Sequence, residues 1–203
     1  MGGTDSATLP MVRRAILGGT FDPPHLAHLV AGEAAFRNLG VDVVTFIPAG
    51  APWQKADRDV TDAAHRWEMT RLATDGVDYF EADDREVHRD GWTYTIDTID
   101  SFPSDDELIL VLGSDAAARM RTWESAERLL ERVGVAVAER PGFDRHMVEK
   151  EIGDVIWLDM PLLPVSGTEL RKRAGEGGSI RFLVREAVWE YIDRHGLYRN
   201  VGE

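Results

Sequence analysis

The 203-residue sequence contains no cysteine, and this absence excludes disulfide bonds and thiolate metal sites. It also lacks an apolar run close to the roughly 18 residues that a membrane-spanning helix needs. The segment before Met11 is small and polar, without the basic and apolar regions of a secretory signal. We therefore expect a cytoplasmic protein that does not cross a membrane, with a flexible extension over residues 1–11.

Basic residues are scarce as well. The chain has 23 lysines and arginines against 36 acidic residues, which gives a formal net charge of −13. Binding to a nucleic-acid backbone needs a broad basic surface, so we expect no nucleic-acid partner. A small polyanion can still bind where a few cationic groups converge. Such groups lie near glycines or expected helix starts at His25 and His28, at Lys55, and at 171–173.

Short apolar runs typical of strands alternate with helical patterns along most of the chain. The expected strands are 12–17, 41–47, 79–82, 108–112, 134–138 and 155–158, and the expected helices are 27–39, 61–74, 95–102, 116–120, 125–131, 145–152 and 181–194. This alternation predicts an α/β fold, a doubly wound, Rossmann-like parallel sheet of five or six strands with helices on both faces. Residues 12–203 would form one domain, with a small C-terminal helical part from about residue 166. Such sheets bind ligands at the carboxyl ends of their strands, near a switch in strand order.

A glycine pair, Gly18 and Gly19, lies between the first expected strand and the first expected helix. Glycines allow a tight turn and a close approach of a ligand to the backbone. The unpaired N–H groups of a helix start favour an anion, and the prolines at 23–24 fit such a start. His25 and His28 are three residues apart and share one face of the helix. If protonated, both would oppose the helix dipole, which makes sense where they face phosphates.

The two histidines have other interpretations. One could be an exposed surface residue and the other a packed residue, with no role in binding a ligand. A zinc site is excluded because no third histidine or carboxylate follows at a suitable spacing. The sequence also lacks both G-x-G-x-x-G and G-x-x-x-x-G-K-[ST], so it has neither a standard dinucleotide site nor a P-loop.

A glycine turn followed by H-x-x-H is typical of the nucleotidyltransferase superfamily. From residue 16 to residue 173 the chain resembles bacterial nicotinate mononucleotide adenylyltransferases. That family joins ATP and nicotinate mononucleotide, giving nicotinate adenine dinucleotide and pyrophosphate, with Mg²⁺ carried by the ATP. The resemblance makes His25 and His28 catalytic contacts of the ATP phosphates and places Asp22 near the mononucleotide and the phosphates, as the one candidate carboxylate for Mg²⁺. The other ATP-binding residues implied here are Gly18, Gly19, Thr20 and Phe21.

The segment 48–55 resembles a family loop that ends in Pro-Pro-His-Lys, but Trp53 and Gln54 replace the usual proline and histidine. The resemblance makes Lys55 a catalytic residue that reaches the phosphates and the mononucleotide. Without the resemblance, an isolated lysine would be a solvated surface residue. Residues 49–60 are the longest irregular stretch near the expected site, which favours a mobile loop.

Two later segments are expected to contact the mononucleotide and the ATP. In 91–99, which resembles the family signature Ser-Tyr-Thr-x-Asp-Thr-Leu, the backbone N–H of Thr93 is expected to hold the nicotinate carboxylate. After the fourth expected strand, Gly113 lets the backbone approach a ribose and Asp115 accepts hydrogen bonds from sugar hydroxyls. Trp123 would stack on the pyridine ring. The structural alternatives are helix caps for Thr93 and Asp115 and a core position for Trp123.

The segment 165–173 resembles the family pattern Ile-Ser-Ser-Thr-x-Ile-Arg, with Gly167 in place of the middle hydroxyl residue. Ser166 and Glu169 have the spacing of a capping box, and a capped helix start also directs N–H groups at an anion. Arg171 is implied to be catalytic, and Arg140, which matches another family segment, is assigned to the mononucleotide. The residues expected at the ATP phosphates are Ser166, Thr168 and Arg171.

These motifs together predict adenylyl transfer from ATP to nicotinate mononucleotide in NAD biosynthesis, without a covalent intermediate. Two alternatives are kept. One is a related nucleotidyltransferase that acts on another phosphorylated acceptor, such as phosphopantetheine. The other is a non-catalytic domain that senses nucleotides. Association of identical subunits is left open.

Overall fold

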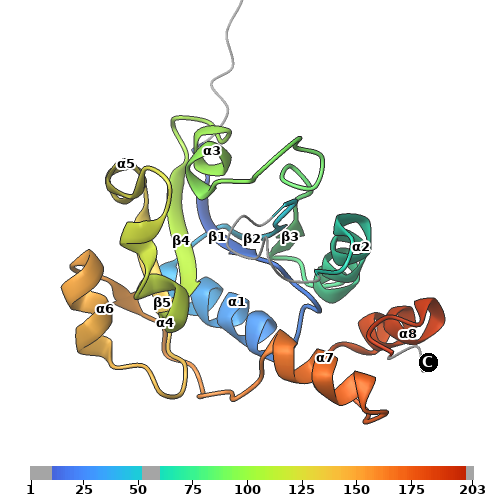
Figure 1. Cartoon of the computed structure of the whole chain (residues 1–203). Helices are drawn as coiled ribbons and strands as arrows, with labels where there is room; N and C mark the ends of the chain where they lie inside the picture. The colour runs from blue at the N-terminus through green and yellow to red at the C-terminus, as the bar shows by residue number, and fades with distance from the viewer. Residues whose placement is uncertain (1–10, 52–59, 200–203) are drawn as a thin grey trace, which may run out of the picture.

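The computed structural model describes residues 11–51 and 60–199. A parallel sheet of six strands forms its centre, in the order β3-β2-β1-β4-β5-β6 (Figure 1). The strands are β1 (Arg13–Gly19), β2 (Val43–Pro48), β3 (Phe80–Ala82), β4 (Glu107–Gly113), β5 (Gly134–Ala138) and β6 (Ile156–Trp157). This order reverses direction between β1 and β4, which is the strand order of doubly wound nucleotide-binding folds. The predicted fold class is confirmed, with six strands.

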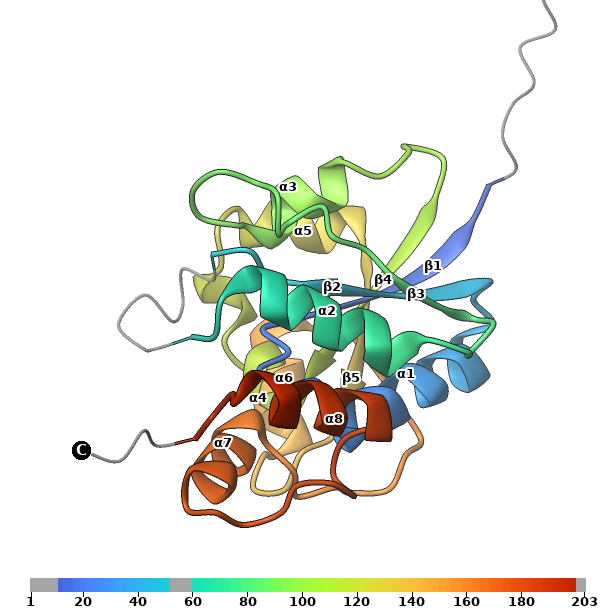
Figure 2. The same cartoon turned by 90° about the vertical axis from the view of Figure 1, so that its right-hand side faces the viewer.

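Helices cover both faces of the sheet, as Figure 2 shows with α3 and α5 above it and α1 below it. The helices are α1 (Leu26–Leu39), α2 (Ala63–Thr74), α3 (Thr95–Asp100), α4 (Ser114–Ala117), α5 (Ala126–Arg132), α6 (Arg145–Ile152), α7 (Gly167–Gly175) and α8 (Glu186–His195), with a short 3₁₀-helix η2 (Met120–Thr122) before α5. Most predicted elements agree with these bounds to within two residues. The expected helix 116–120 is instead the short α4 followed by η2.

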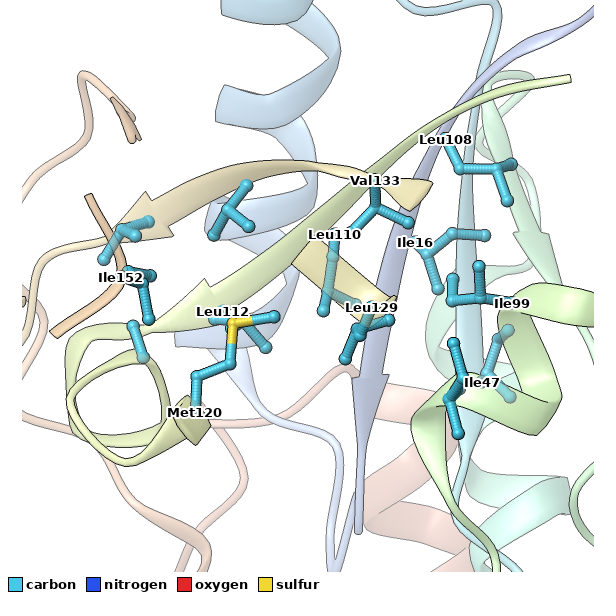
Figure 3. Packing of buried hydrophobic residues seen from close by; sticks show 14 of the residues in the cluster. Ile16, Ile47, Ile99, Leu108, Leu110, Leu112, Met120, Leu129, Val133 and Ile152 are labelled. Atoms are coloured by element: carbon cyan, nitrogen blue, oxygen red, sulfur yellow. The ribbon is translucent and has the colours of Figure 1, made fainter. Parts of the chain in front are cut away.

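Alternate residues of the central strands enter two different cores. Leu108, Leu110 and Leu112 of β4 pack with Ile99 of α3 and Leu129 of α5 (Figure 3). The residues between them face α1 on the opposite side of the sheet. This alternation follows from the two-residue period of a strand. A strand buried on both faces therefore appears in the sequence as a continuous apolar run, as in 108–112.

A third core joins α2 to the C-terminal helices. Met69 of α2 packs with Leu170 of α7 and with Val188 and Ile192 of α8. The closing helix was expected over 181–194, but α8 begins only at Glu186. The preceding residues form a turn in which the Leu183 carbonyl accepts the backbone N–H of Leu26. This contact with the start of α1 stabilises the turn, so the prediction of a helix from residue 181 is wrong for 181–185.

Two further expectations concern the ends of the chain and membranes. Of the extension predicted over 1–11, residues 1–10 lie outside the described residues. Within 11–51 and 60–199, every helix is too short or too polar to span a bilayer.

Candidate active site

A cavity of about 320 Å³ opens at the carboxyl ends of the strands, where β1 and β4 lie side by side. The chain continues from β1 into α1 on one face of the sheet and from β4 into α4 on the other, so the two connections diverge at this point. Ligands of open α/β sheets bind in such a crevice. The polar or glycine residues that line the cavity include Gly18, Gly19, Thr20, His28, Glu86, Thr93, Gly113, Asp115, Arg119, Glu139 and Arg140.

The two glycines that end β1 have different neighbours. A Cβ atom on Gly18 would meet nothing within 4 Å, so the backbone there is open to the cavity. A Cβ atom on Gly19 would lie 3.2 Å from the ring of Phe21. That ring is buried, and Phe21 has a φ of 49°, which a bulky residue adopts only where packing holds it. Gly18 is therefore the glycine that lets a ligand approach, whereas Gly19 makes room for Phe21.

The two histidines are stacked at the start of α1. His25 is the N-cap residue and is only 1 % exposed, while His28 lines the cavity. Their ring centroids are 3.7 Å apart at an interplanar angle of 21°. The backbone N–H of His25 donates to Nδ1 of His28 over 3.2 Å. Because Nδ1 accepts this bond, the proton of a neutral His28 ring lies on Nε2.

The position of His25 behind the cavity wall affects its charge. Burial lowers its pKa to about 3, and the positive charge of Arg140 acts in the same direction. Its Nδ1 atom is buried and has no hydrogen-bond partner among the described residues. A ring with so low a pKa is neutral at neutral pH, so His25 is a neutral ring stacked behind His28. The physical reason is desolvation, which disfavours the charged form.

The end of β4 carries an ion pair. Nε of Arg140 lies 3.5 Å from Oδ1 of Asp115, and the Arg140 backbone N–H donates to Oγ of Ser114. A Cβ atom on Gly113 would lie 2.6 Å from the Asp115 carboxylate and 3.0 Å from Nε of Arg140. The ends of these two side chains therefore lie over the Gly113 backbone. A ribose could approach Gly113 only after their flexible ends move aside.

The opposite wall of the cavity is formed near α3 and η2. Trp123 lines the cavity and also packs against the core above the sheet, so both interpretations of this residue agree with the structure. The backbone N–H of Thr93 donates to the carbonyl of Ala51 over 3.2 Å. This N–H therefore already donates to a carbonyl of the protein, whereas the sequence-based expectation was that it binds the nicotinate carboxylate. Thr93 itself still lines the cavity beside Glu86, whose pKa is raised by burial and whose Oε1 accepts a hydrogen bond from Thr98.

Comparisons with known proteins agree with this geometry. Residues 16–173 match the family model described as cytidylyltransferase-like. A protein from Thermoanaerobacter sp. named a probable nicotinate-nucleotide adenylyltransferase is 40% identical over 200 residues, which cover 93% of this chain and 95% of that protein. A protein of the same name from Moorella thermoacetica is 38% identical over 199 residues and 92% of each chain. The chain belongs to the nicotinate-nucleotide adenylyltransferase family.

A solved structure supports the fold. The nicotinic acid mononucleotide adenylyltransferase of Plasmodium falciparum, in complex with NaAD, superposes with a TM-score of 0.79 at 21% identity, covering 94% of this chain and 100% of that one. The resemblance stated from the motifs is thereby confirmed at the level of family and fold. Of the residues that it implied for the site, nine lie together on the cavity wall: Gly18, Gly19, Thr20, His28, Thr93, Gly113, Asp115, Trp123 and Arg140.

Asp22 is placed differently from the family-based expectation. It is 5 % exposed and is not on the cavity wall. Its Oδ1 accepts the hydroxyl of Tyr198 over 2.7 Å, and its Oδ2 accepts the backbone N–H of Thr61 over 3.2 Å. Both carboxylate oxygens therefore bind the protein itself, so Asp22 is not available to the mononucleotide or to Mg²⁺ in this conformation. The contact with Tyr198 comes from the C-terminal end of the described chain.

Helix α7 is joined to the backbone of the same residue, Asp22. Ser166 caps the helix by accepting the backbone N–H of Glu169. Nη1 of Arg171 donates to the Asp22 carbonyl over 2.7 Å, and a Cβ atom on Gly167 would lie 2.8 Å from that carbonyl. The close approach accounts for a glycine at 167. The residues expected at the ATP phosphates in this segment are not on the cavity wall: Ser166, Thr168 and Arg171.

Some predicted residues lie elsewhere or outside the described part of the chain. The rings of Phe21 and His25 are buried behind the cavity wall rather than on it. Lys55, together with Trp53 and Gln54, falls in 52–59, which the structure does not describe, so the predictions for this loop stay predictions.

Sequence reasoning missed three residues that shape the site. Glu86 lines the cavity, Tyr198 holds Asp22, and Arg66 is buried behind the loops that follow β1 and β2. Each is an isolated polar residue outside the motifs. No local pattern distinguishes Glu86 or Tyr198 from a solvated residue, whereas Arg66 lies on the apolar face of an expected helix.

Proposed function

We propose that this protein transfers the adenylyl group of ATP to nicotinate mononucleotide, giving nicotinate adenine dinucleotide and pyrophosphate. The observation that carries this proposal is the cavity at the switch in strand order. Its wall combines the open glycine turn and His28 with Asp115 and Trp123. A triphosphate and a flat ring with its sugar need these two kinds of surface in one crevice.

The reaction needs alignment and positive charge more than a protein nucleophile. A phosphate oxygen of the mononucleotide attacks the α-phosphorus of ATP, a new P–O bond forms, and the bond to the bridging oxygen of pyrophosphate breaks. The attacking phosphate is already ionised at neutral pH, so no strong general base is required. Holding both substrates in line accounts for about 7–11 kcal/mol of barrier lowering.

The protein places its cationic and donor groups at this cavity although its net charge is strongly negative. His28, Arg119 and Arg140 all lie on the wall. With Nδ1 of His28 accepting a backbone N–H, Nε2 is the donor that we assign to the phosphate oxygens. A donor directed at charge that develops in the transition state contributes about 3–4 kcal/mol. The stacked, neutral ring of His25 holds the ring of His28 in place.

Mg²⁺ enters this proposal as part of the Mg–ATP substrate, bound mainly by phosphate and water oxygens. Since the Asp22 carboxylate is engaged by Tyr198 and Thr61, we no longer assign it to the ion. A cytoplasmic location, where ATP is present, also belongs to the proposal.

A pyrophosphate-release assay tests this function against its alternatives. The purified chain is incubated with Mg–ATP and, in separate reactions, with nicotinate mononucleotide, nicotinamide mononucleotide or phosphopantetheine. We expect nicotinate mononucleotide to give the highest kcat/KM. A higher value with phosphopantetheine would establish the related nucleotidyltransferase instead. ATP binding without turnover of any acceptor would indicate a nucleotide-sensing domain.

A further inference from the structure

Arg66, near the start of α2, has the largest side chain that is fully buried in the described protein. It is 1 % exposed, although it carries a guanidinium group that stays protonated in proteins. Burial lowers the pKa of Arg66, and the nearby charge of Asp22 opposes this effect. A buried charge is costly unless hydrogen bonds satisfy it. The partners of the Arg66 hydrogen bonds therefore indicate the role of this residue.

The guanidinium binds the main chain of three separate segments. Nε donates to the carbonyl of Thr61 over 2.7 Å, just before α2. Nη1 donates to the carbonyl of Thr20 over 3.0 Å and also to that of Ala49. Nη2 donates to the carbonyl of Gly50 over 2.7 Å. All of these acceptors are backbone carbonyl oxygens, which an apolar residue at 66 could not bind.

Two of the residues whose carbonyls Arg66 binds also line the cavity. Thr20 follows β1 and Ala49 follows β2, and both line the cavity wall. The two loops are also joined directly, because the backbone N–H of Ala49 donates to the Gly19 carbonyl over 2.9 Å. One guanidinium behind the wall therefore fixes the separation of the loops that end two neighbouring strands. The rigid, planar fork of arginine suits this task, whereas a lysine carries the same charge at a single point.

We infer that Arg66 is a positioning residue for adenylyl transfer, an inference that rests on the proposed function. Arg66 touches the backbone of Thr20, Ala49 and Gly50 rather than a substrate. It acts by holding the wall beside the glycine turn in one shape. A displacement of about 1 Å in a site of this kind costs about 100-fold in rate.

The first test replaces Arg66 by lysine. Arg66→Lys keeps the charge but cannot hold all four carbonyls, so we expect kcat with ATP and nicotinate mononucleotide to fall by roughly 10- to 100-fold in a folded protein. The matched control is Leu39→Ala, which opens a cavity in the core at the far end of α1. It should lower the melting temperature at least as much, yet leave kcat within about twofold when both proteins are assayed in their folded state.

A second variant disturbs the hydrogen bonds of Arg66 without changing Arg66 itself. A Cβ atom on Gly50 would lie 2.0 Å from the carbonyl oxygen of Glu86. Gly50→Ala must therefore move the main chain of Gly50 and that of Glu86 apart, which disturbs the segment whose carbonyl accepts the hydrogen bond from Nη2 of Arg66. We expect a loss of kcat similar to that of Arg66→Lys. If kcat stays within about twofold of the wild type in both variants, the inference is wrong.

Amide hydrogen exchange separates positioning from a general loss of stability. In Arg66→Lys, the amide of Ala49 should exchange faster while the amides of α8 keep their wild-type rates. Uniformly faster exchange, or a variant that fails to fold, would show that Arg66 serves the fold only and would overturn the inference. A wild-type chain that is inactive with every acceptor would disprove the proposed function. The exchange measurement would still decide whether Arg66 holds the loops that follow β1 and β2.

Discussion

The two strand ends that meet at the cavity are built in different ways. After β1, the backbone of Gly18 is open, and His28 already has its donor nitrogen defined by a backbone contact. After β4, the side chains of Asp115 and Arg140 lie over Gly113. The first end is thus shaped before any ligand arrives, because packing and main-chain hydrogen bonds fix it. The second end is covered by two partly exposed side chains that can rearrange at little cost.

The largest expected effect on catalysis is at the β1 end of the cavity. His28→Ala removes the donor that we assign to the phosphates, and kcat should fall by about 100-fold or more. Steady-state pyrophosphate release measures the effect. His88→Ala is the matched control, because His88 is exposed and bonded to Asp84 outside the cavity. A His28→Ala variant with nearly wild-type turnover would remove the distinction between the two ends.

Beyond the β4 end, Trp123→Ala tests the ring-binding surface. Stacking of an aromatic side chain on a base contributes about 1–3 kcal/mol. We therefore expect the KM for nicotinate mononucleotide to rise by roughly 10-fold or more, with a smaller change for ATP. Titration of each substrate separately provides the measurement. A change confined to the ATP affinity would contradict the assignment of Trp123 to the pyridine ring.

The two glycines of the β1 end should respond differently to the same added methyl group. In Gly19→Ala the new carbon lies against the Phe21 ring, so the free energy of unfolding should fall by about 1–3 kcal/mol. In Gly18→Ala the carbon enters the open cavity, which should leave stability nearly unchanged and raise the KM for ATP. Urea unfolding and steady-state kinetics on both variants give the comparison. Equal losses of stability would show that Gly18 is not open in solution.

Acid should destabilise the protein, because burial and, to a smaller extent, the charge of Arg140 lower the pKa of His25. In the unfolded chain a histidine takes up a proton below about pH 6.5, whereas buried His25 does so only near pH 3. The unfolded state therefore binds more protons in this window. Stability is fully present above about pH 6.5 and falls as the pH decreases, by about 1.4 kcal/mol per pH unit for this group.

The variant His25→Asn isolates this contribution, since asparagine is also a good N-cap residue. Its free energy of unfolding, measured by urea titration between those pH values, should depend less steeply on pH than that of the wild type. Parallel curves for the two proteins would mean that His25 is not buried in the neutral form.

The smallest effect on stability is expected at the covered end. Asp115→Asn weakens an ion pair whose side chains are about one third exposed, and such pairs contribute about 0–1 kcal/mol. Thermal unfolding should therefore hardly change, while the KM values should shift because the side chains over Gly113 are rearranged. A loss of stability as large as that of Gly19→Ala would show that the β4 end is as rigid as the β1 end.

The local part of the site could be predicted from the sequence. The turn at Gly18 and Gly19, the place of His28 on the following helix, and the glycine that ends β4 all depend on a few neighbouring residues. Their common edge follows from the parallel sheet, because strands of the same direction present their carboxyl ends together. The helix cap at Ser166 was predicted for the same reason, since a capping box is a contact within four residues.

The direction of several polar side chains could not be predicted. Asp22 was expected in the site from the family resemblance, but the hydroxyl of Tyr198, 176 residues later, donates to its carboxylate. Arg171 was expected at the phosphates, but it donates to the Asp22 carbonyl across 149 residues. Arg66 has no motif and yet binds both loops beside the cavity. Each of these contacts forms only when α2, α7 or the segment after α8 packs against the loops that follow β1 and β2.

By itself, the sequence determined the alternation of strands and helices, the glycine turns at the strand ends and therefore the edge of the sheet where the cavity opens. Those features follow from local backbone preferences and from the burial of short apolar runs. Only the tertiary structure decided which polar groups at that edge face the cavity and which are engaged behind it. The reason is that a buried polar group must find a partner, and the partners of Asp22 and Arg171 come from segments far away in the chain.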